Sequence, residues 1–477
     1  MKIFKLMIIM FLTGTAVLTP YTYTSANNLA DTETDRIYSI VVDRFLNADT
    51  ASDENVTVDE NPEMRFGGDF QGIEDNLDYI KKMGFTAIHL SPVFQFADDD
   101  YLGYDVESYD EIDAGLGGEE GLNSLVDAAH DMDLEVFVDL PAVSVDGENT
   151  ADDVKVNDIY GGYLEEKDIN ILDLTDASVQ SGYQDMVQNF VDEYNIDGVS
   201  MMVAQDDVDA SEILPGGIKT YGFLTSEDAA AGGFDYMATE SMRTELAEAF
   251  ATIDREIPEI PDSENMLLVD HWFSERFTSH AVAENMFPGT RVKQVMTYMY
   301  SHTGPVSMLY GTEVAFNGEE MPTIHPQMDL WTDQELVEYL EHINQVYSDH
   351  KNALTGELET LHNSDGHYIT RYHTNEVDFI LNVNDTGATH GVNLALDDVD
   401  EDQVLSGMLI GDMIRATSPG EYIAVLDREE TELYAIIEEQ GFNNGYIIAS
   451  IIIFGGFAVF IFFAAWNGRK HKKKKRA

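Results

Sequence analysis

The stretch 76–90 reads Asn-Leu-Asp-Tyr-Ile-Lys-Lys-Met-Gly-Phe-Thr-Ala-Ile-His-Leu. Apolar residues recur at spacings of three and four up to Met83, which predicts a helix, and Ala87–Leu90 has the length and composition of a buried strand. Further apolar runs lie at Ile37–Val42, Val136–Leu140, Gly198–Val203 and Met266–Val269, and further helical periods at Leu122–Met132 and Tyr183–Tyr194. Strands that alternate with helices indicate βαβ units and a parallel sheet.

The alternating pattern extends from about Asp35 to Gly318. Eight βα units need roughly 250 residues, which this span provides, so the pattern predicts an α/β domain with a parallel sheet, which we assign to residues 27–350. The polar, glycine-containing segment 144–172 predicts a short insertion after the third strand. Residues 351–428 show alternating strands separated by Asn, Asp and Gly, which predicts a C-terminal antiparallel β domain.

The two ends of the chain carry apolar segments. Lys2 and Lys5 precede an apolar run, and small residues follow at Thr24–Ala26. This arrangement predicts a secretory signal peptide over residues 1–26, with a second membrane anchor as the alternative. Residues 446–466 contain no charge and no proline, which predicts one transmembrane helix.

The orientation of the predicted helix follows from the basic tail, residues 467–477, because basic clusters beside a membrane helix stay in the cytoplasm. Residues 429–445 would form a stalk. We therefore expect a single-pass protein of the cell membrane, with its N-terminal domain extracellular and its C-terminal tail cytoplasmic.

The composition is strongly acidic, with 26 Lys and Arg against 89 Asp and Glu, a net charge of −63 and no cysteine. Such a charge repels nucleic acid, so we expect no nucleic-acid partner. It fits adaptation to high salt, where repulsion is screened within about 3 Å at 1 M. A surface that gathers cations or meets a basic partner is the alternative. Without cysteine, the exported domain holds together without disulfides.

Several short strings stand in a characteristic order. They include Asp43-Arg44-Phe45, Phe66–Ile73, Gly84–Pro92, Gly103-Tyr104-Asp105, Asp139-Leu140-Pro141, Asn195–Val199, Val269-Asp270, Gly304-Pro305-Val306 and Tyr310–Glu313. In this order and spacing they resemble the α-amylase family, glycoside hydrolase family thirteen. The resemblance covers roughly residues 35–318. It implies a (β/α)8 TIM barrel with a short insertion after the third strand, and an active site at the C-terminal ends of the barrel strands.

The resemblance also implies a retaining mechanism, which needs a carboxylate nucleophile and a carboxylic acid/base. The family's nucleophile motif reads Gly, apolar, Arg, apolar, Asp. Here Ser200 takes the place of the arginine and Met202 that of the nucleophile. Phe273 stands at the third carboxylate, and Phe223 is the best match to the acid/base, although Glu227 lies four residues further on.

Around these positions the resemblance places three substrate-binding residues, Tyr104, Trp272 and Arg276, with Tyr104 as the sugar-stacking tyrosine. The sequence thus offers no catalytic residue by family match. Met202, Phe223, Trp272 and Phe273 would instead form an apolar cluster at the barrel mouth. Such a cluster could be core, a ligand platform, or the neighbour of a displaced active site that uses Asp139, Asp206, Glu227 or Asp270.

These substitutions predict that the protein is not an enzyme. We expect a membrane-tethered, extracellular, catalytically inactive protein that binds carbohydrate, such as an α-glucan, or acts as a scaffold. One alternative is an active α-glucan hydrolase with a rearranged acid pair. A second is an ectodomain subunit of an envelope protein assembly.

A calcium site is also implied by the resemblance, because a loop with Asn47, Asp49 and Asp53 would approach Gly67 and Asp69. Calcium takes several oxygen ligands at about 2.3–2.6 Å. A solvated acidic loop is the alternative. The family's other calcium site would be lost, because Val143 replaces its asparagine ligand.

Overall fold

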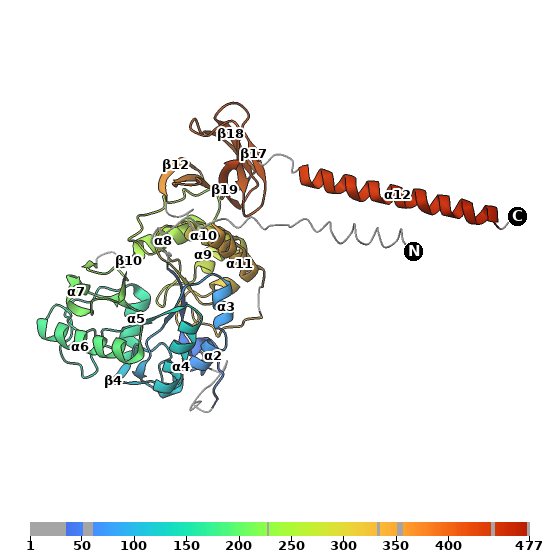
Figure 1. Cartoon of the computed structure of the whole chain (residues 1–477). Helices are drawn as coiled ribbons and strands as arrows, with labels where there is room; N and C mark the ends of the chain where they lie inside the picture. The colour runs from blue at the N-terminus through green and yellow to red at the C-terminus, as the bar shows by residue number, and fades with distance from the viewer. Residues whose placement is uncertain are drawn as a thin grey trace. The chain divides into compact units, whose positions relative to one another are not determined.

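The computed structural model of the chain describes residues 35–50, 61–226, 229–331, 334–350, 356–439 and 444–474 (Figure 1). The predicted signal peptide lies outside the described residues, and so do Asp53 and Glu227.

A seven-stranded parallel sheet forms the wall of the first domain. In spatial order its strands are β10 (Tyr236–Thr239), β8 (Lys219–Leu224), β6 (Gly198–Val203), β5 (Glu135–Asp139), β2 (Ala87–Leu90), β1 (Arg36–Ile40) and β11 (Val306–Leu309). All neighbours in this order are parallel, as expected when each connection contains a helix.

A short segment between the two edge strands closes the sheet into a barrel. The Met266 N–H donates to the Met237 carbonyl of β10 at 2.8 Å, and the Ser307 N–H of β11 donates to the Leu267 carbonyl at 2.9 Å. This segment bridges both edges without forming a full strand. The barrel thus has seven strands and one bridging segment, where the family resemblance implies eight equivalent strands.

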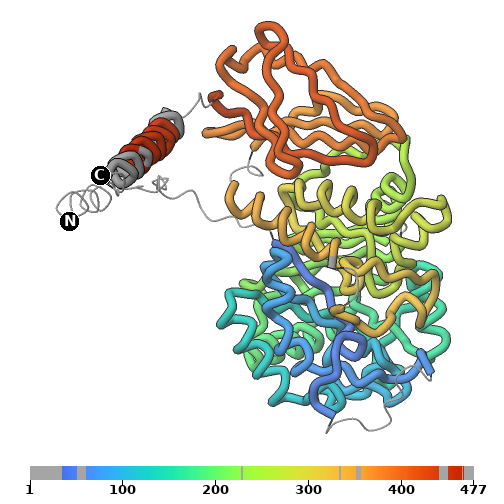
Figure 2. Tube along the Cα trace, turned by 90° about the vertical axis from the view of Figure 1, so that its right-hand side faces the viewer, coloured from blue at the N-terminus to red at the C-terminus, as the bar shows by residue number. Residues whose placement is uncertain are grey.

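Helices cover the outside of the barrel (Figures 1 and 2). They are α2 (Phe70–Glu74), α3 (Leu77–Lys82), α4 (Gly118–Asp131), α5 (Asp158–Lys167), α6 (Ala177–Tyr194), α7 (Ala210–Ile213), α8 (Glu240–Ala251), α9 (Phe277–Ala283), α10 (Pro288–Tyr300) and α11 (Gln334–Asp349). The segment between β5 and α6 contains α5. A small hairpin of β3 (Phe94–Phe96) and β4 (Val106–Ile112) follows β2.

Local sequence explains the longest of these helices. The Asp176 carboxylate caps α6 by accepting the N–H groups of Ser178 and Val179, and the helix ends at Asn195, which adopts a left-handed conformation. Its buried residues recur every three or four positions at Tyr183, Val187, Phe190, Val191 and Tyr194. This spacing is the one that the sequence pattern used to predict the helix.

The C-terminal domain is antiparallel. Its larger sheet has the order β12 (Glu357–Ser364), β13 (His367–His373), β14 (Phe379–Asn384), β19 (Glu430–Glu438), β16 (Gln403–Gly407) and β17 (Met413–Arg415), and β15 (His390–Ala395) pairs with β18 (Glu421–Leu426). Figure 2 shows these strands gathered in one body, in orange. The buried strand β19 occupies residues that the sequence pattern assigned to a stalk.

A buried ion pair joins the two domains. The Arg291 guanidinium of α10 lies 2.7 Å from the Asp385 carboxylate and 2.9 Å from that of Glu429. Arg291 and Asp385 are almost fully buried, so the charge of each is compensated by the opposite charge of the other.

The predicted transmembrane helix is wrong, and with it the predicted single-pass location in the cell membrane. The segment 446–466 does lie in a helix, α12 (Asn444–Lys474). However, no helix in the described part of the chain is both long enough and apolar enough to cross a membrane. The barrel and the antiparallel domain, in contrast, fit the structure.

Candidate functional site

A small cavity lies inside the barrel, near the C-terminal ends of its strands. Its lining includes Asp139, Met202, Phe223, Asp270 and His271. Its volume is about 40 Å³. One water needs about 10–15 Å³, whereas small-molecule sites measure about 300–1,000 Å³. The cavity can therefore hold a few waters but no sugar ring.

Aromatic rings close the barrel mouth above Phe273. The ring of Tyr160 stacks on that of Phe273, with centroids 4.0 Å apart and an interplanar angle of 16°. Tyr104 and Tyr163 contact the same phenylalanine at centroid distances of 5.0 and 5.5 Å. All four rings are buried. Since Tyr160 and Tyr163 belong to α5, the inserted segment supplies half of this aromatic cluster.

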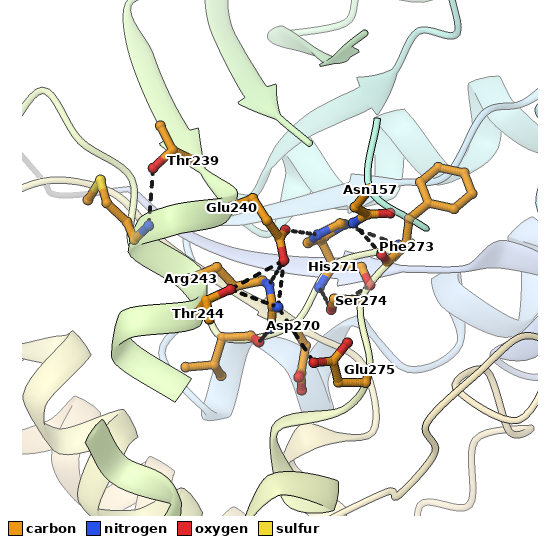
Figure 3. Close-up of polar contacts among 12 residues, drawn as sticks. Asn157, Thr239, Glu240, Arg243, Thr244, Asp270, His271, Phe273, Ser274 and Glu275 are labelled. Atoms are coloured by element: carbon orange, nitrogen blue, oxygen red, sulfur yellow. Dashed lines mark hydrogen bonds and ion pairs between the residues drawn. The ribbon is translucent and has the colours of Figure 1, made fainter. Parts of the chain in front are cut away.

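A hydrogen bond ties the start of α5 to the same place. The Asn157 side-chain amide donates to the Phe273 carbonyl at 2.9 Å (Figure 3). The Asn157 side-chain oxygen caps α5 by accepting the Tyr160 N–H. One residue thus fixes both the beginning of α5 and the loop that carries Phe273. The polar glycine-containing sequence of this segment gave no clear sign of such a role.

The three residues at the family's catalytic positions do not form one group. Met202 and Phe223 are direct neighbours on β6 and β8 and both line the cavity. The Phe223 ring lies 4.1 Å from the ring of His271. Phe273 belongs to the aromatic cluster with Tyr160 instead.

Asp139 ends β5 and is fully buried. Its carboxylate accepts hydrogen bonds from the hydroxyls of Tyr104 and Ser200. Burial raises the pKa of Asp139 to about 6, although both hydrogen bonds oppose this shift. Ser200, which replaces the family's arginine, therefore satisfies a carboxylate without adding a charge.

A chain of polar side chains continues from Ser200 across the barrel interior. His89 lies between two hydroxyls, with Nε2 2.7 Å from Ser200 Oγ and Nδ1 2.9 Å from Ser39 Oγ. The Ser39 hydroxyl is in turn 2.9 Å from that of Ser307. Burial lowers the pKa of His89 to about 3, so the imidazole is neutral. The chain is uncharged from Ser307 to Ser200.

Asp270 and Arg276 serve the local structure. The Asp270 carboxylate accepts the Phe277 N–H at 2.6 Å and the Thr312 hydroxyl at 2.9 Å. The Arg276 guanidinium donates to the carbonyls of Ile324 and Tyr310 at 2.7 and 2.9 Å. Both residues are buried.

Three residues were assigned to substrate binding, namely Tyr104, Trp272 and Arg276, and at most 1% of the surface of each is exposed. In this conformation none of them is accessible to a sugar. Their assignment to substrate binding remains a prediction.

An ionic cluster that the sequence analysis missed lies where β10 meets α8 (Figure 3). The Glu240 carboxylate accepts from Arg243 at 2.6 Å and lies 3.1 Å from His271 Nε2. The Phe273 N–H donates to His271 Nδ1, which places the imidazole hydrogen on Nε2. Burial lowers the pKa of His271, so the ring is neutral.

Burial disfavours ionisation of Glu240, but the hydrogen bonds from His271 and Arg243 outweigh it and lower the pKa of Glu240 to about 2. A carboxylate that is this firmly ionised cannot act as a proton donor at neutral pH. The spacing of Glu240 and Arg243, three residues apart at a helix start, was the signal that could have revealed the pair.

Of the other acids considered for a displaced site, Asp206 forms an ion pair with Lys155, and Glu227 is outside the described residues. Lys155 and the Ala230 N–H lower the pKa of Asp206. Asp206 therefore serves as the anchor of a surface loop.

The calcium site remains a prediction, because Asp53 lies outside the described residues, but Asp69 and Gly67 already have other partners. The Asp69 carboxylate accepts three backbone N–H groups, from Ala48 at 3.0 Å, Asp49 at 2.6 Å and Gly72 at 2.6 Å. The Gly67 N–H donates to another carboxylate, that of Asp43. Within the described ranges, no group of three or more His, Cys, Asp or Glu is placed to hold a metal.

Comparison with known proteins gives a consistent result in two parts of the chain. A family model described as the α-amylase catalytic domain matches residues 36–144, and one for the α-amylase C-terminal domain matches residues 356–434. The β/α-amylase of Paenibacillus polymyxa is 25% identical over 403 residues, 73% of this chain and 33% of the relative. A cyclomaltodextrinase of Bacillus sp is 36% identical over 107 residues, 21% of this chain and 19% of the relative.

The chain thus spans about a third or less of the length of these two curated relatives. Solved structures match over nearly their whole length. An Anoxybacillus α-amylase superimposes with a TM-score of 0.74 and 25% identity, over 86% of this chain and 99% of the other. A Geobacillus thermoleovorans α-amylase complexed with acarbose gives 0.72 and 26%, over 85% and 99%.

Proposed function

The chain belongs to the α-amylase family, and from that premise we propose that it is a catalytically inactive member, which binds α-glucans without cleaving them. Retaining hydrolysis needs a carboxylate nucleophile and a carboxylic acid, about 5–5.5 Å apart on either side of the bond to be cleaved. Met202 and Phe223 offer neither a carboxylate nor a proton.

The observation that carries the proposal is the stack of Tyr160 on Phe273. It occupies the end of the seventh barrel position, where the resemblance places the third carboxylate. The nearby carboxylates already have partners: Asp139 with two hydroxyls, Asp270 with a backbone amide and a hydroxyl, and Glu240 with Arg243 and His271. Among the described residues, a sugar would therefore find a closed mouth and no carboxylate there without a partner.

The ligand class is supported by the relatives. The Geobacillus thermoleovorans structure contains acarbose, and a further solved amylase fold, AmyP, contains maltose. Since this chain retains both the barrel and the C-terminal domain of such proteins, we propose the same class of ligand. Binding at the barrel mouth requires Tyr160 to leave Phe273.

The first test measures release of reducing ends from soluble starch and maltotriose by the purified protein. We expect none above a buffer blank. The rival function is hydrolysis by a rearranged acid pair, in which Asp139 is the best proton donor because its pKa is about 6. Activity that is present in the wild type and lost in Asp139→Asn would refute the proposal.

The second test measures maltotriose binding by calorimetry in the wild type and in Tyr160→Ala. Removal of the ring opens the mouth, so we expect tighter binding by the variant. Tyr236→Ala is the matched control, because Tyr236 also stacks on an aromatic ring, that of Tyr221, but lies at the start of β10. If neither the wild type nor Tyr160→Ala binds maltotriose, the carbohydrate-binding role is wrong.

A further inference from the structure

An open groove lies on the outside of the barrel, between the loop of residues 143–149 and the first half of α6. Its volume is about 350 Å³, within the range of small-molecule sites at about 300–1,000 Å³. It shares no lining residue with the barrel cavity. The closed barrel mouth is therefore not the largest space available to a ligand in this part of the fold.

A glycine in α6 keeps this groove open. Gly182 lies in the interior of an 18-residue helix, where glycine is less favourable than almost any other residue. A Cβ atom added to Gly182 would meet no described atom within 4 Å, so packing does not require the glycine. A side chain there would project from α6 into the groove, which Gly182 lines.

The floor of the groove is apolar and includes one well-fixed aromatic ring. Val143, Leu172, Val179 and Met186 contribute aliphatic surface. The Tyr109 hydroxyl donates to the Pro141 carbonyl at 2.8 Å and accepts the Val143 N–H at 3.1 Å, which holds its ring in place. An aromatic face attracts a cation within about 6 Å.

The charges of the groove have one sign. Asp146 and Glu148 line its rim, and its lining, all within the described residues, includes no Lys, Arg or His. The Glu148 N–H and the Ser144 hydroxyl lower the pKa of Asp146, so this carboxylate is ionised at neutral pH. The nearby start of α6 does not attract an anion, because the Asp176 carboxylate already caps it.

We propose that this groove binds an organic ammonium ion with an apolar body. The apolar floor accepts the body, the Tyr109 ring and the two rim carboxylates stabilise the charge, and Gly182 leaves the space that the ligand fills. This site does not depend on the function proposed for the barrel mouth.

The direct test titrates n-hexylammonium, 1-hexanol and n-hexanoate into the full-length protein by calorimetry at one ionic strength. The three probes have the same apolar body and differ in charge. We expect the ammonium to bind at least about tenfold more tightly than the carboxylate, because close charges of opposite sign attract. Equal affinities of the ammonium and the carboxylate would overturn the proposal.

Two variants locate the site. Gly182→Leu should weaken hexylammonium binding by about tenfold or more, because the new side chain fills the groove, whereas the fold should be retained because leucine favours helix. Gly162→Leu is the matched control, since Gly162 is also an exposed helix glycine with open space around it, in α5. Equal loss in both variants, or no loss in Gly182→Leu, would contradict the site.

The rim charges are tested by the double variant Asp146→Asn, Glu148→Gln. It should weaken binding of hexylammonium and leave that of hexanol unchanged. Two results together would refute the proposal: hexylammonium does not bind, and Gly182→Leu abolishes binding of maltotriose. The groove would then be a sugar site.

Discussion

Two regions of the barrel differ in the residues that stand at the family's motif positions. In residues 36–144, which match the catalytic-domain family model, buried charges remain and are held by backbone amides and aromatic rings. In residues 145–355, the strand ends that would carry the catalytic carboxylates hold Met202, Phe223 and Phe273. The difference is that the first region keeps the charged motifs of the resemblance, whereas these three positions of the second region carry no carboxylate.

In the first region the buried charges of Asp43 and Arg44 depend on each other and on their neighbours. The Asp43 carboxylate accepts the N–H groups of Phe66 and Gly67, at 2.9 and 3.0 Å, and lies 3.4 Å from the Arg44 guanidinium. That guanidinium lies 3.7 and 3.8 Å from the ring centroids of Phe66 and Tyr101. Removal of the Asp43 carboxylate would leave the buried Arg44 guanidinium without its ionic partner.

In the second region, the apolar side chains at the family's catalytic positions are packed in the core. Met202, Phe223 and Phe273 are all buried in one continuous core, so the replacements cost no hydrophobic contact. A carboxylate and an arginine that disappear together leave no unpaired charge behind.

The largest expected effect is therefore in the first region. Asp43→Ala leaves the Arg44 charge buried, so we expect the free energy of unfolding to fall by about 3–5 kcal/mol at pH 7. Urea denaturation at constant salt measures the change. Glu284→Ala is the control, because its ion pair with Arg255 is half exposed and should contribute less than about 1 kcal/mol. Equal losses in the two variants would remove the distinction between the regions.

Asp139, near the boundary of the two regions, should give the next largest effect. Its pKa is about 6 in the folded protein and about 3.9 in the unfolded chain. The folded state holds the proton more tightly, so this contribution is fully present below about pH 4 and is lost as the pH rises through 6. Between pH 4 and 7 the wild type should lose about 2 kcal/mol relative to Asp139→Asn. Parallel profiles would show that the carboxyl is not buried in this way.

Glu240, in the second region, should show a smaller effect of opposite sign. Its pKa is lowered to about 2, so its contribution is present above about pH 4.5 and is lost as the pH falls towards 2. We expect Glu240→Gln to reduce stability by about 1–2 kcal/mol at pH 7 and by less at pH 3. Denaturant unfolding at both pH values measures this difference. A larger deficit at pH 3 would contradict the assignment.

The smallest expected effect concerns calcium. Because the Asp69 carboxylate is already satisfied by three N–H groups, a chelator should leave the melting temperature unchanged at matched ionic strength. Thermal unfolding with and without chelator measures this. A fall of several degrees that added calcium reverses would mean that the loop beside Asp69 does hold the ion.

The sequence alone determines the fold class and the residue types at the family's catalytic positions. The alternation of apolar runs and helical periods predicts the parallel sheet, because both periods are local properties of the chain, and the family resemblance adds the closed barrel. The identities of Met202 and Phe273 exclude the family mechanism at those positions, because no arrangement makes a carboxylate of a thioether or a phenyl ring. The membrane helix shows the limit of such reasoning, since an apolar run predicted a span that the described helices do not support.

Other features were decided only by the tertiary structure. Gly161 and Gly162 weaken the helical pattern of α5, so nothing local shows that Tyr160 reaches Phe273, 113 residues away. The pairing of Glu240 with His271 and the place of β19 in its sheet also join distant segments. Local periodicity determines which elements form, whereas the partners of a buried side chain depend on how the barrel closes around it.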